Sequence, residues 1–218
     1  MDQPASHYPT PVAKAADLTV HLAGLTLALF GGGVLLGLSI GVGGLGRVAA
    51  VSVYALGLLT MLGCSTAYNF AREHHQPLLR RFDHAAIFLM IAGSYTPFTT
   101  QNLTGMWSIA MTSAVWAIAG LGVIGKLFLP GLGRRFWVGI YLALGWIVLV
   151  AIKPMIEGLG WVALLLLALG GLIYSTGVIF YLMKRLTFRR AIWHGHVIGG
   201  AGLHYAAVLV GVILTPTS

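Results

Sequence analysis

The sequence predicts an all-α integral membrane protein, a bundle of seven transmembrane helices with a cytoplasmic amino terminus and an external carboxyl terminus. Composition gives the class, since 58% of the 218 residues are hydrophobic and only 8% are charged. Soluble domains usually carry about 25% charged residues, so a soluble globular protein is excluded. Long apolar stretches give the number of helices, and the distribution of positive charge gives their direction.

Seven mostly apolar stretches approach or reach the length needed to cross a hydrocarbon layer about 30 Å thick. In chain order they are residues 18–40, 48–70, 85–102, 106–127, 136–152, 159–183 and 191–214. They lack the alternation of polar and apolar residues that is typical of barrel strands. In lipid a helix satisfies every backbone group within its own segment, so each stretch is predicted to be helical.

Positive charges border these stretches on one side. The first, third, fifth and seventh stretches begin just after Lys or Arg residues, and the second, fourth and sixth end beside them. The residues concerned are Lys14, Arg72, Arg80, Arg81, Lys126, Arg134, Arg135, Lys184, Arg185, Arg189 and Arg190, against Arg47 and Lys153 on the other side. Because cytoplasmic connections are enriched in Lys and Arg, the amino terminus and the even-numbered connections are predicted to be cytoplasmic.

The connections are short, so we expect one membrane domain, residues 17–214, between a cytoplasmic tail, residues 1–16, and an external tail, residues 215–218. The net charge of +8 is explained by orientation and by attraction to anionic head groups. With no separate basic domain, membrane lipids and not nucleic acid are the expected partners. The spacing of Gly195 and Gly199 would suit a homo-oligomer through glycine-rich helix faces, although we favour packing within the bundle.

Two acidic residues stand directly before predicted spans. For Asp17 and Asp83 a helix cap and a functional role are about equally supported. An Asp at the centre of a bilayer costs about 2.5–3.5 kcal/mol, so acids near spans usually have partners or a function. We favour a functional role for Asp83 over Asp17, because other spans also end in polar residues on the side where Asp83 lies.

Those other polar residues come from the second and seventh spans. Ser65 and Asn69 are four residues apart, so they share one face of a helix near its cytoplasmic end. His194 lies about three residues into the seventh span, at a similar depth. Three helices are therefore predicted to present Ser65, Asn69, Asp83 and His194 to one cavity.

Several ordered segments carry a resemblance to a known family. They are 17–24 (DLTVHLAG), 64–69 (CSTAYN), 82–88 (FDHAAIF) with 92–97 (AGSYTP), 170–177 (GGLIYSTG), 192–194 (IWH) and 203–205 (LHY). With them the chain resembles the hemolysin III family, the bacterial branch of the group that includes the adiponectin and progestin receptors and, more distantly, the alkaline ceramidases. The resemblance implies seven spans, a cytoplasmic amino terminus and a place in the bacterial inner (plasma) membrane.

The resemblance also implies a zinc ion. It is held by one histidine from Ser-x-x-x-His in the second span and two from His-x-x-x-His in the seventh, beside the Ser and an Asp. Carried onto this chain, Ser65 and Asp83 are the catalytic candidates and His194 is a metal ligand. Asn69 and Arg190 stand at the other two ligand positions and are non-ligands, because a carboxamide binds zinc poorly and a guanidinium offers no lone pair. These substitutions weaken the expectation of zinc.

Arg190 suggests a replacement for the ion. We hypothesise that its fixed positive charge pairs with Asp83 and keeps the bundle closed without metal. The alternative is that His74 or His75 folds back to complete a metal site.

Two classes of function remain open. The first is a hemolysin III-like membrane protein of undetermined biochemical activity, in membrane-lipid homeostasis, sensing or permeability, with cytolysis suggested by the family name. The second is a metal-dependent lipid-amide hydrolase, similar to a ceramidase, with an altered metal site. A retinal photoreceptor is excluded, because the seventh span contains no lysine to form a Schiff base.

Overall fold

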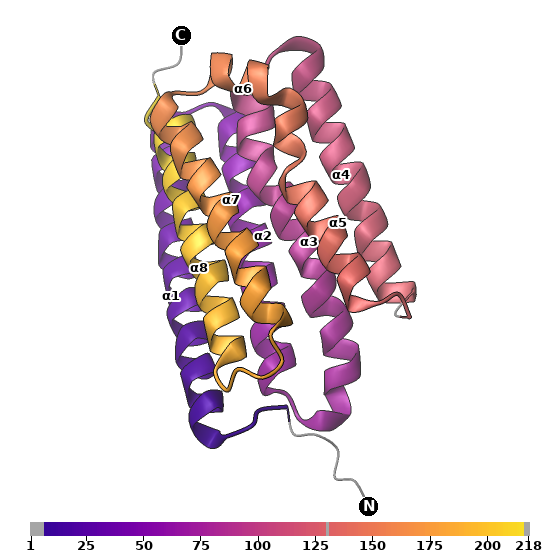
Figure 1. Ribbon diagram of the computed structural model, residues 1–218. Helices are drawn as coiled ribbons and strands as arrows, with labels where there is room; N and C mark the ends of the chain where they lie inside the picture. The colour runs from indigo at the N-terminus through magenta and orange to yellow at the C-terminus, as the bar shows by residue number, and fades with distance from the viewer. Residues whose placement is uncertain (1–6, 130, 216–218) are drawn as a thin grey trace, which may run out of the picture.

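The computed structural model describes residues 7–129 and 131–215, and every regular element within these ranges is helical (Figure 1). The elements are α1 (Pro11–Val42), α2 (Leu45–Phe70), η1 (Glu73–His75), α3 (Gln76–Gln101), α4 (Gly105–Phe128), α5 (Arg134–Gly145), η2 (Ile147–Ala151), α6 (Ile152–Gly158), α7 (Trp161–Leu182), α8 (Arg189–Val208) and η3 (Leu209–Ile213). The helices η1 and η2 are 3₁₀, and η3 is a turn of π-helix that continues α8.

Six segments of the described chain are long and apolar enough to cross a membrane: α1, α2, α4, the stretch Arg134–Gly158, α7, and α8 with η3. The protein is therefore an integral membrane protein. One further long helix, α3, is not among these six, and it carries Arg80, Arg81 and Asp83 in its first half. It packs between α2 and α4, where Thr96 accepts a hydrogen bond from Trp116 (3.1 Å) and Arg81 donates one to the carbonyl of Leu127 (3.2 Å), so α4 supplies partners to part of its polar face.

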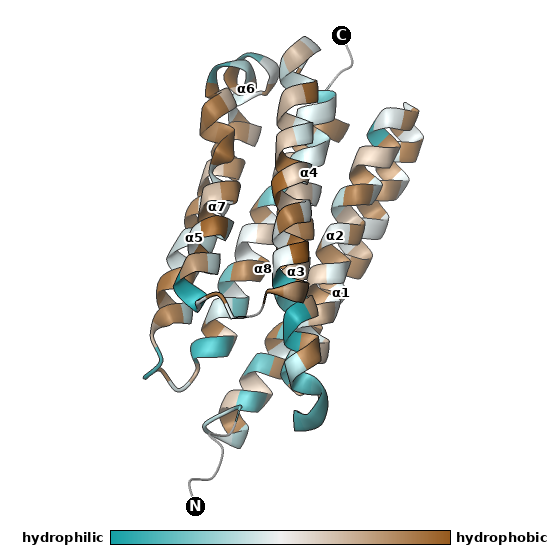
Figure 2. Ribbon diagram, turned by 90° about the vertical axis from the view of Figure 1, so that its right-hand side faces the viewer, coloured by the Kyte–Doolittle hydropathy of each residue, from teal (hydrophilic) through white to brown (hydrophobic). Residues whose placement is uncertain are grey.

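The helices alternate in direction, so α1, α3, α5 and α8 begin at one end of the bundle, where α2, α4 and α7 end (Figure 1). We call this the amino end. Eleven of the thirteen Lys and Arg residues lie there, as the charge pattern predicted. Figure 2 shows hydrophilic residues gathered towards this end, while the shafts of the helices are mostly apolar. The cytoplasmic location of the amino end stays a prediction.

Two helices begin earlier than expected. Thr10 caps α1, because its Oγ1 accepts a hydrogen bond from the backbone N of Ala13 (3.1 Å), and Asp17 lies in the second turn. The helix α3 begins at Gln76, which places Asp83 in the third turn. A capping role is thus wrong for both acids. The amino-terminal tail expected over residues 1–16 ends at residue 10, and its residues 1–6, like residues 216–218, lie outside the described ranges.

The span expected over 136–152 is broken into α5, η2 and α6. Pro154 stands near the start of α6, where its missing N–H and its ring prevent the α-helix from running on unbroken. Tyr95 satisfies the backbone groups freed at the break: its hydroxyl donates to the carbonyl of Gly145 (2.7 Å) and accepts from the N–H of Val148 (3.1 Å). One side chain from α3 thereby holds an interrupted span in place.

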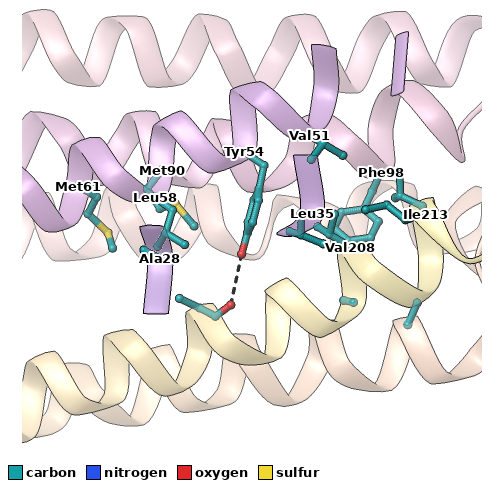
Figure 3. Packing of buried hydrophobic residues seen from close by; sticks show 14 of the residues in the cluster. Ala28, Leu35, Val51, Tyr54, Leu58, Met61, Met90, Phe98, Val208 and Ile213 are labelled. Atoms are coloured by element: carbon teal, nitrogen blue, oxygen red, sulfur yellow. Dashed lines mark hydrogen bonds between the residues drawn. The ribbon is translucent and has the colours of Figure 1, made fainter. Parts of the chain in front are cut away.

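The largest buried cluster joins α1, α2 and α8 (Figure 3). Tyr54 at its centre is fully buried, and its hydroxyl donates to the carbonyl of Ala201 (3.3 Å). Leu35, Val51 and Val208 pack nearby, each without solvent exposure. Because lipid tails are as apolar as these side chains, close packing and hydrogen bonds hold the helices together.

Glycines bring α2 and α3 into close contact. A Cβ at Gly93 would lie 3.2 Å from the carbonyl O of Val53, and one at Gly57 would lie 3.3 Å from that of Leu89. Gly195 and Gly199, whose spacing we assigned to packing within the bundle, lie instead on an exposed face of α8, and a Cβ at Gly195 would contact nothing within 4 Å. That assignment was wrong for Gly195.

The Gly93 contact predicts a stability change. Gly93→Val should lower the free energy of unfolding by about 1–3 kcal/mol, because the new side chain pushes apart two helices that touch at the backbone. The matched control is Gly63→Val on α2, where a Cβ would contact nothing within 4 Å. Thermal unfolding in detergent measures both variants, and equal unfolding temperatures would contradict the close-contact interpretation.

Candidate functional site

The site begins on α1, where Asp17 and His21 lie one turn apart on the face turned into the bundle. Both side chains are buried, with 0% and 1% exposure. His21 Nδ1 lies 2.9 Å from the backbone carbonyl of Asp17. A carbonyl only accepts hydrogen bonds, so Nδ1 of His21 carries a proton and its Nε2 has a free lone pair.

The carboxylate of Asp17 is shared between two partners from distant parts of the chain. Its Oδ1 lies 2.6 Å from His194 Nδ1, and its Oδ2 accepts a hydrogen bond from the hydroxyl of Tyr8. Burial, and then the hydrogen bond and negative charge of Asp17, raise the pKa of Tyr8, so that this hydroxyl stays a donor. Asp17 therefore orients His194 with its Nδ1 protonated and its Nε2 lone pair free.

Ser65 on α2 faces both free lone pairs. Its Oγ lies 3.4 Å from Nε2 of His194 and 3.3 Å from Nε2 of His21. The two imidazole rings are 4.2 Å apart between centroids. Such distances are long for hydrogen bonds at rest, but catalytic contacts often shorten only when substrate binds. The arrangement is a serine hydroxyl, an imidazole and a carboxylate in series.

Arg190 and Asn69 form a second hydrogen-bonded series that also ends at Ser65. Nη1 of Arg190 donates to Oδ1 of Asn69 (2.9 Å). Because a guanidinium can only donate, the oxygen of the Asn69 amide must face Arg190. Its Nδ2 then faces the opposite way, where it donates to the backbone O (2.9 Å) and approaches the Oγ (3.4 Å) of Ser65.

His7 lies over this second series from the amino-terminal segment. Its Nε2 is 3.1 Å from Oδ1 of Asn69, and its Nδ1 is 3.2 Å from Nη2 of Arg190. Since Arg190 donates, Nδ1 must accept and Nε2 must donate, which is the pattern of a neutral imidazole. Burial, and then the positive charge of Arg190, lower the pKa of His7 and favour this neutral form.

One cavity of about 670 Å³ contains the residues predicted to meet. Ser65, Asn69, Asp83 and His194 all line it, as expected, and His21 joins them. The cavity continues past His194 along α8 to His204, ten residues further, a rise of about 15 Å. A long pocket with its charged groups gathered at one end suits a ligand that has a polar head and an apolar chain.

The hypothesis that Arg190 pairs with Asp83 is wrong. The guanidinium of Arg190 contacts Asn69 and His7, and within residues 7–129 and 131–215 the carboxylate found beside basic side chains is that of Asp17, which contacts His21 and His194. Asp83 lies instead beside Ser65, approaching it from α3. The reason is geometric: Arg190 lies at the first turn of α8, where Asn69 and the segment before α1 are nearer.

The ligand positions implied by the family resemblance do not fit zinc. The one amide oxygen of Asn69 already accepts from Arg190 and His7, and Arg190 has no lone pair. His74 and His75 contact each other edge to face in η1, exposed at the surface, and neither lines the cavity. A different set does offer metal-ligand chemistry: atoms of Asp17, His21 and His194 lie within 4.8 Å of one another.

Sequence reasoning missed the contribution of α1 and of the segment before it. Asp17 was weighed as a cap, and His21 appeared only within a matching segment. One available signal was their spacing of four residues, which puts two ionisable groups on one face of an apolar helix. Thr10 followed by Pro11 was the other, since it marks a helix start that places Asp17 inside the helix.

Comparisons with known proteins agree with this architecture. A sequence profile of the family described as "Haemolysin-III related" matches residues 15–205. The chain is 37% identical over 174 residues to Hemolysin-3 of Bacillus cereus, covering 77% of each protein. It is 34% identical over 159 residues to the Hemolysin-3 homolog of Bacillus subtilis (strain 168), covering 73% of this chain and 75% of that protein. The human Monocyte to macrophage differentiation factor is 28% identical over 172 residues, covering 76% and 71%. The resemblance expected from the sequence is confirmed.

The docking of His7 should depend on pH. Its pKa is lowered in the docked state, so the undocked segment binds protons more readily, and docking weakens as the pH falls below the ordinary value of 6.5. The effect can reach at most about tenfold per pH unit. Hydrogen exchange of the segment around residues 7–16, corrected for intrinsic rates, should show protection at pH 7.5 that declines towards pH 5. His7→Gln should remove this dependence, and an unchanged pH response in that variant would contradict the assignment.

Proposed function

Because the chain belongs to the haemolysin-III-related family of membrane proteins and holds Ser65, His194 and Asp17 in series, we propose that it is a lipid-acyl hydrolase with a serine nucleophile. The observation that carries the proposal is the orientation of His194. Its Nδ1 is 2.6 Å from the buried carboxylate of Asp17, and its Nε2 faces the hydroxyl of Ser65 at 3.4 Å. Ser65, His194 and Asp17 therefore correspond to the nucleophile, the general base and the orienting carboxylate of serine hydrolases.

In the first half of the reaction Ser65 Oγ attacks the carbonyl carbon of an ester or amide, and Nε2 of His194 takes the hydroxyl proton. The tetrahedral intermediate collapses, the bond to the leaving group breaks, and the departing alcohol or amine takes the proton from His194. The products of this half are an acyl group on Ser65 and a free alcohol or amine. The carboxylate of Asp17 stabilises the imidazolium that forms between the two proton transfers.

In the second half a water molecule takes the place of the leaving group. His194 accepts a proton from the water, whose oxygen attacks the acyl carbon. The bond to Ser65 Oγ breaks, His194 returns the proton to that oxygen, and a fatty acid is released. The protein ends in the state in which it began.

We assign to Asn69, through the second N–H of its amide, the stabilisation of the negative oxygen of the tetrahedral intermediate. Its Nδ2 lies 3.4 Å from the attacking oxygen, and Arg190 fixes the amide so that a donor points this way. Preorganised donors of this kind are usually worth roughly 100- to 1000-fold in rate. The two substitutions that remove the family's zinc ligands thus have a joint role here.

The cavity supports a lipid as the substrate. Its charged residues lie near the amino end of the bundle, and its lining continues about 15 Å further to His204, which leaves length for an acyl chain inserted into the bundle. We place the amino end on the cytoplasmic side of a bacterial inner membrane, on the strength of the charge distribution. Of the roles expected from the sequence, membrane-lipid homeostasis accords best with such a site.

The donor atoms of Asp17, His21 and His194 favour a second candidate, a metal-dependent lipid-amide hydrolase with a rearranged ligand set. A divalent ion bound there would supply an activated water. In that case Asp17 would be a ligand instead of orienting His194, and Ser65 would face the ion from α2. Asp83, beside Ser65, keeps the catalytic role predicted for it in this candidate.

Removal of the serine tests the first candidate. Ser65→Ala should reduce the release of fatty acid from short-chain ester and amide lipids by ~1000-fold or more, because the nucleophile is lost. A fluorophosphonate probe should label Ser65 in the unchanged protein, and labelling should fall in His194→Ala. Ser52→Ala, on the same helix but at its other end, is the control. Full activity in Ser65→Ala would contradict the proposal.

Metal content separates the two candidates. The serine mechanism predicts far less than one zinc per purified chain, and activity that survives dialysis against a chelator. About one zinc per chain, lost in both His21→Ala and His194→Ala, would replace the serine mechanism by the metal-dependent one. Elemental analysis and the fatty-acid assay, run on the same preparations, give the two readouts.

A further inference from the structure

Lys126 is a buried cation that lines the cavity, and no carboxylate of the described residues lies within ion-pair distance of it. It lies in the last turn of α4 and is only 7% exposed, whereas the other three lysines of the chain are exposed. Its Nζ is 3.3 Å from Nδ1 of His84 and lies over the ring of Trp137, 4.4 Å from the centroid. Ring faces and a neutral imidazole lower the cost of burying this charge but do not neutralise it.

The neighbours of Lys126 add positive charge. Arg80 lies close enough to act electrostatically on Lys126, His84 and Asp83. Arg81, Arg134, Arg189 and Arg190 line the same cavity. Within the described ranges the contacts between carboxylates and basic side chains are those of Asp17 with His21 and His194, so these cations have no carboxylate at ion-pair distance. Asp83 is near enough to act electrostatically on Lys126, but it is a single carboxylate among several cations. Arg80 and Arg81 are exposed, so the cost of lost water falls mainly on Lys126, and an anion bound beside it would offset that cost.

Lys126 lies close to the residues proposed to be catalytic. His84, its contact, directly follows Asp83, which lies beside Ser65. Lys126 and Ser65 both line this cavity, near the amino end of the bundle. A ligand with its acyl chain in the apolar part would hold a polar head between α3, α4 and α5.

From this juxtaposition we propose that Lys126 and Arg80 form a subsite for the phosphate of an anionic lipid. Phosphate is preferred because its several oxygens can accept from both cations at once, in charge-assisted hydrogen bonds. The subsite rests on the proposed function in one respect: if the protein hydrolyses lipids, the lipid bound here is its substrate. Binding itself requires no hydrolysis, so the two proposals can fail separately.

The test measures binding to the Ser65→Ala protein in detergent, in which the lipid is not consumed. The probes are oleoyl lysophosphatidic acid, the neutral monoolein, and inorganic phosphate, followed by native mass spectrometry. Lys126→Met should weaken binding of the phosphate lipid by ~10- to 100-fold, as expected for a charge-assisted contact, and leave monoolein unchanged. Lys126→Arg should retain most of the affinity, and its folding is checked by thermal unfolding.

The matched control is Lys184→Met, which removes the same charge from an exposed position outside this cavity. Equal losses in Lys126→Met and Lys184→Met would show general surface attraction and overturn the subsite. Unchanged affinity in Lys126→Met would overturn it as well. Binding of inorganic phosphate as tight as that of the phosphate lipid would show that the subsite takes a free anion and not a lipid. Loss of hydrolysis alone leaves the binding result standing.

Discussion

The buried carboxylate of Asp17 is the constraint on which the amino end of the bundle depends. An ionised carboxylate without solvent exposure needs partners that compensate for lost water, and here they come from α8 and from the segment before α1. His194 and Tyr8 fill this need, and by doing so they fix α8 against α1. The contact thus explains at once why the helix ends converge, why His194 has one defined tautomer, and why Ser65 faces a free lone pair.

A partly buried charge also needs partners, and this explains the contacts of Arg190. At a site that also held a divalent cation, its positive charge would be repelled. Arg190 instead meets two neutral acceptors, Asn69 and His7, and turns the Asn69 amide towards Ser65. In the family pattern these positions would hold ligands. In this chain they form a polar network with His7 and Ser65, and such networks rigidify the groups that they connect. The two residues act together: Arg190 and the backbone carbonyl of Ser65 hold the Asn69 amide from opposite sides.

Much of this could be predicted from the sequence, and the failures have physical causes. Hydropathy predicted the helices, charge predicted which helix ends lie together at one end of the bundle, and helical spacing brought Ser65, Asn69 and His194 to one depth. Hydropathy also placed the start of the first helix at residue 18, because the turns before it are too polar to count as a span. That error made Asp17 look like a cap. The partner of Arg190 could not be found in this way, since His7 lies in a segment without periodicity and its position depends on the assembled helices.

The position of His7 and Tyr8 bears on how the protein is handled at the bench. These two residues touch Asp17, Asn69 and Arg190, so the segment directly before α1 is part of the wall around the site. A polyhistidine tag fused upstream of His7 would add imidazoles, and any metal that they carry from a purification column, to the chain that leads into this segment. The helix η3 ends at the far end of the bundle (Figure 1), so a fusion after it leaves this wall untouched.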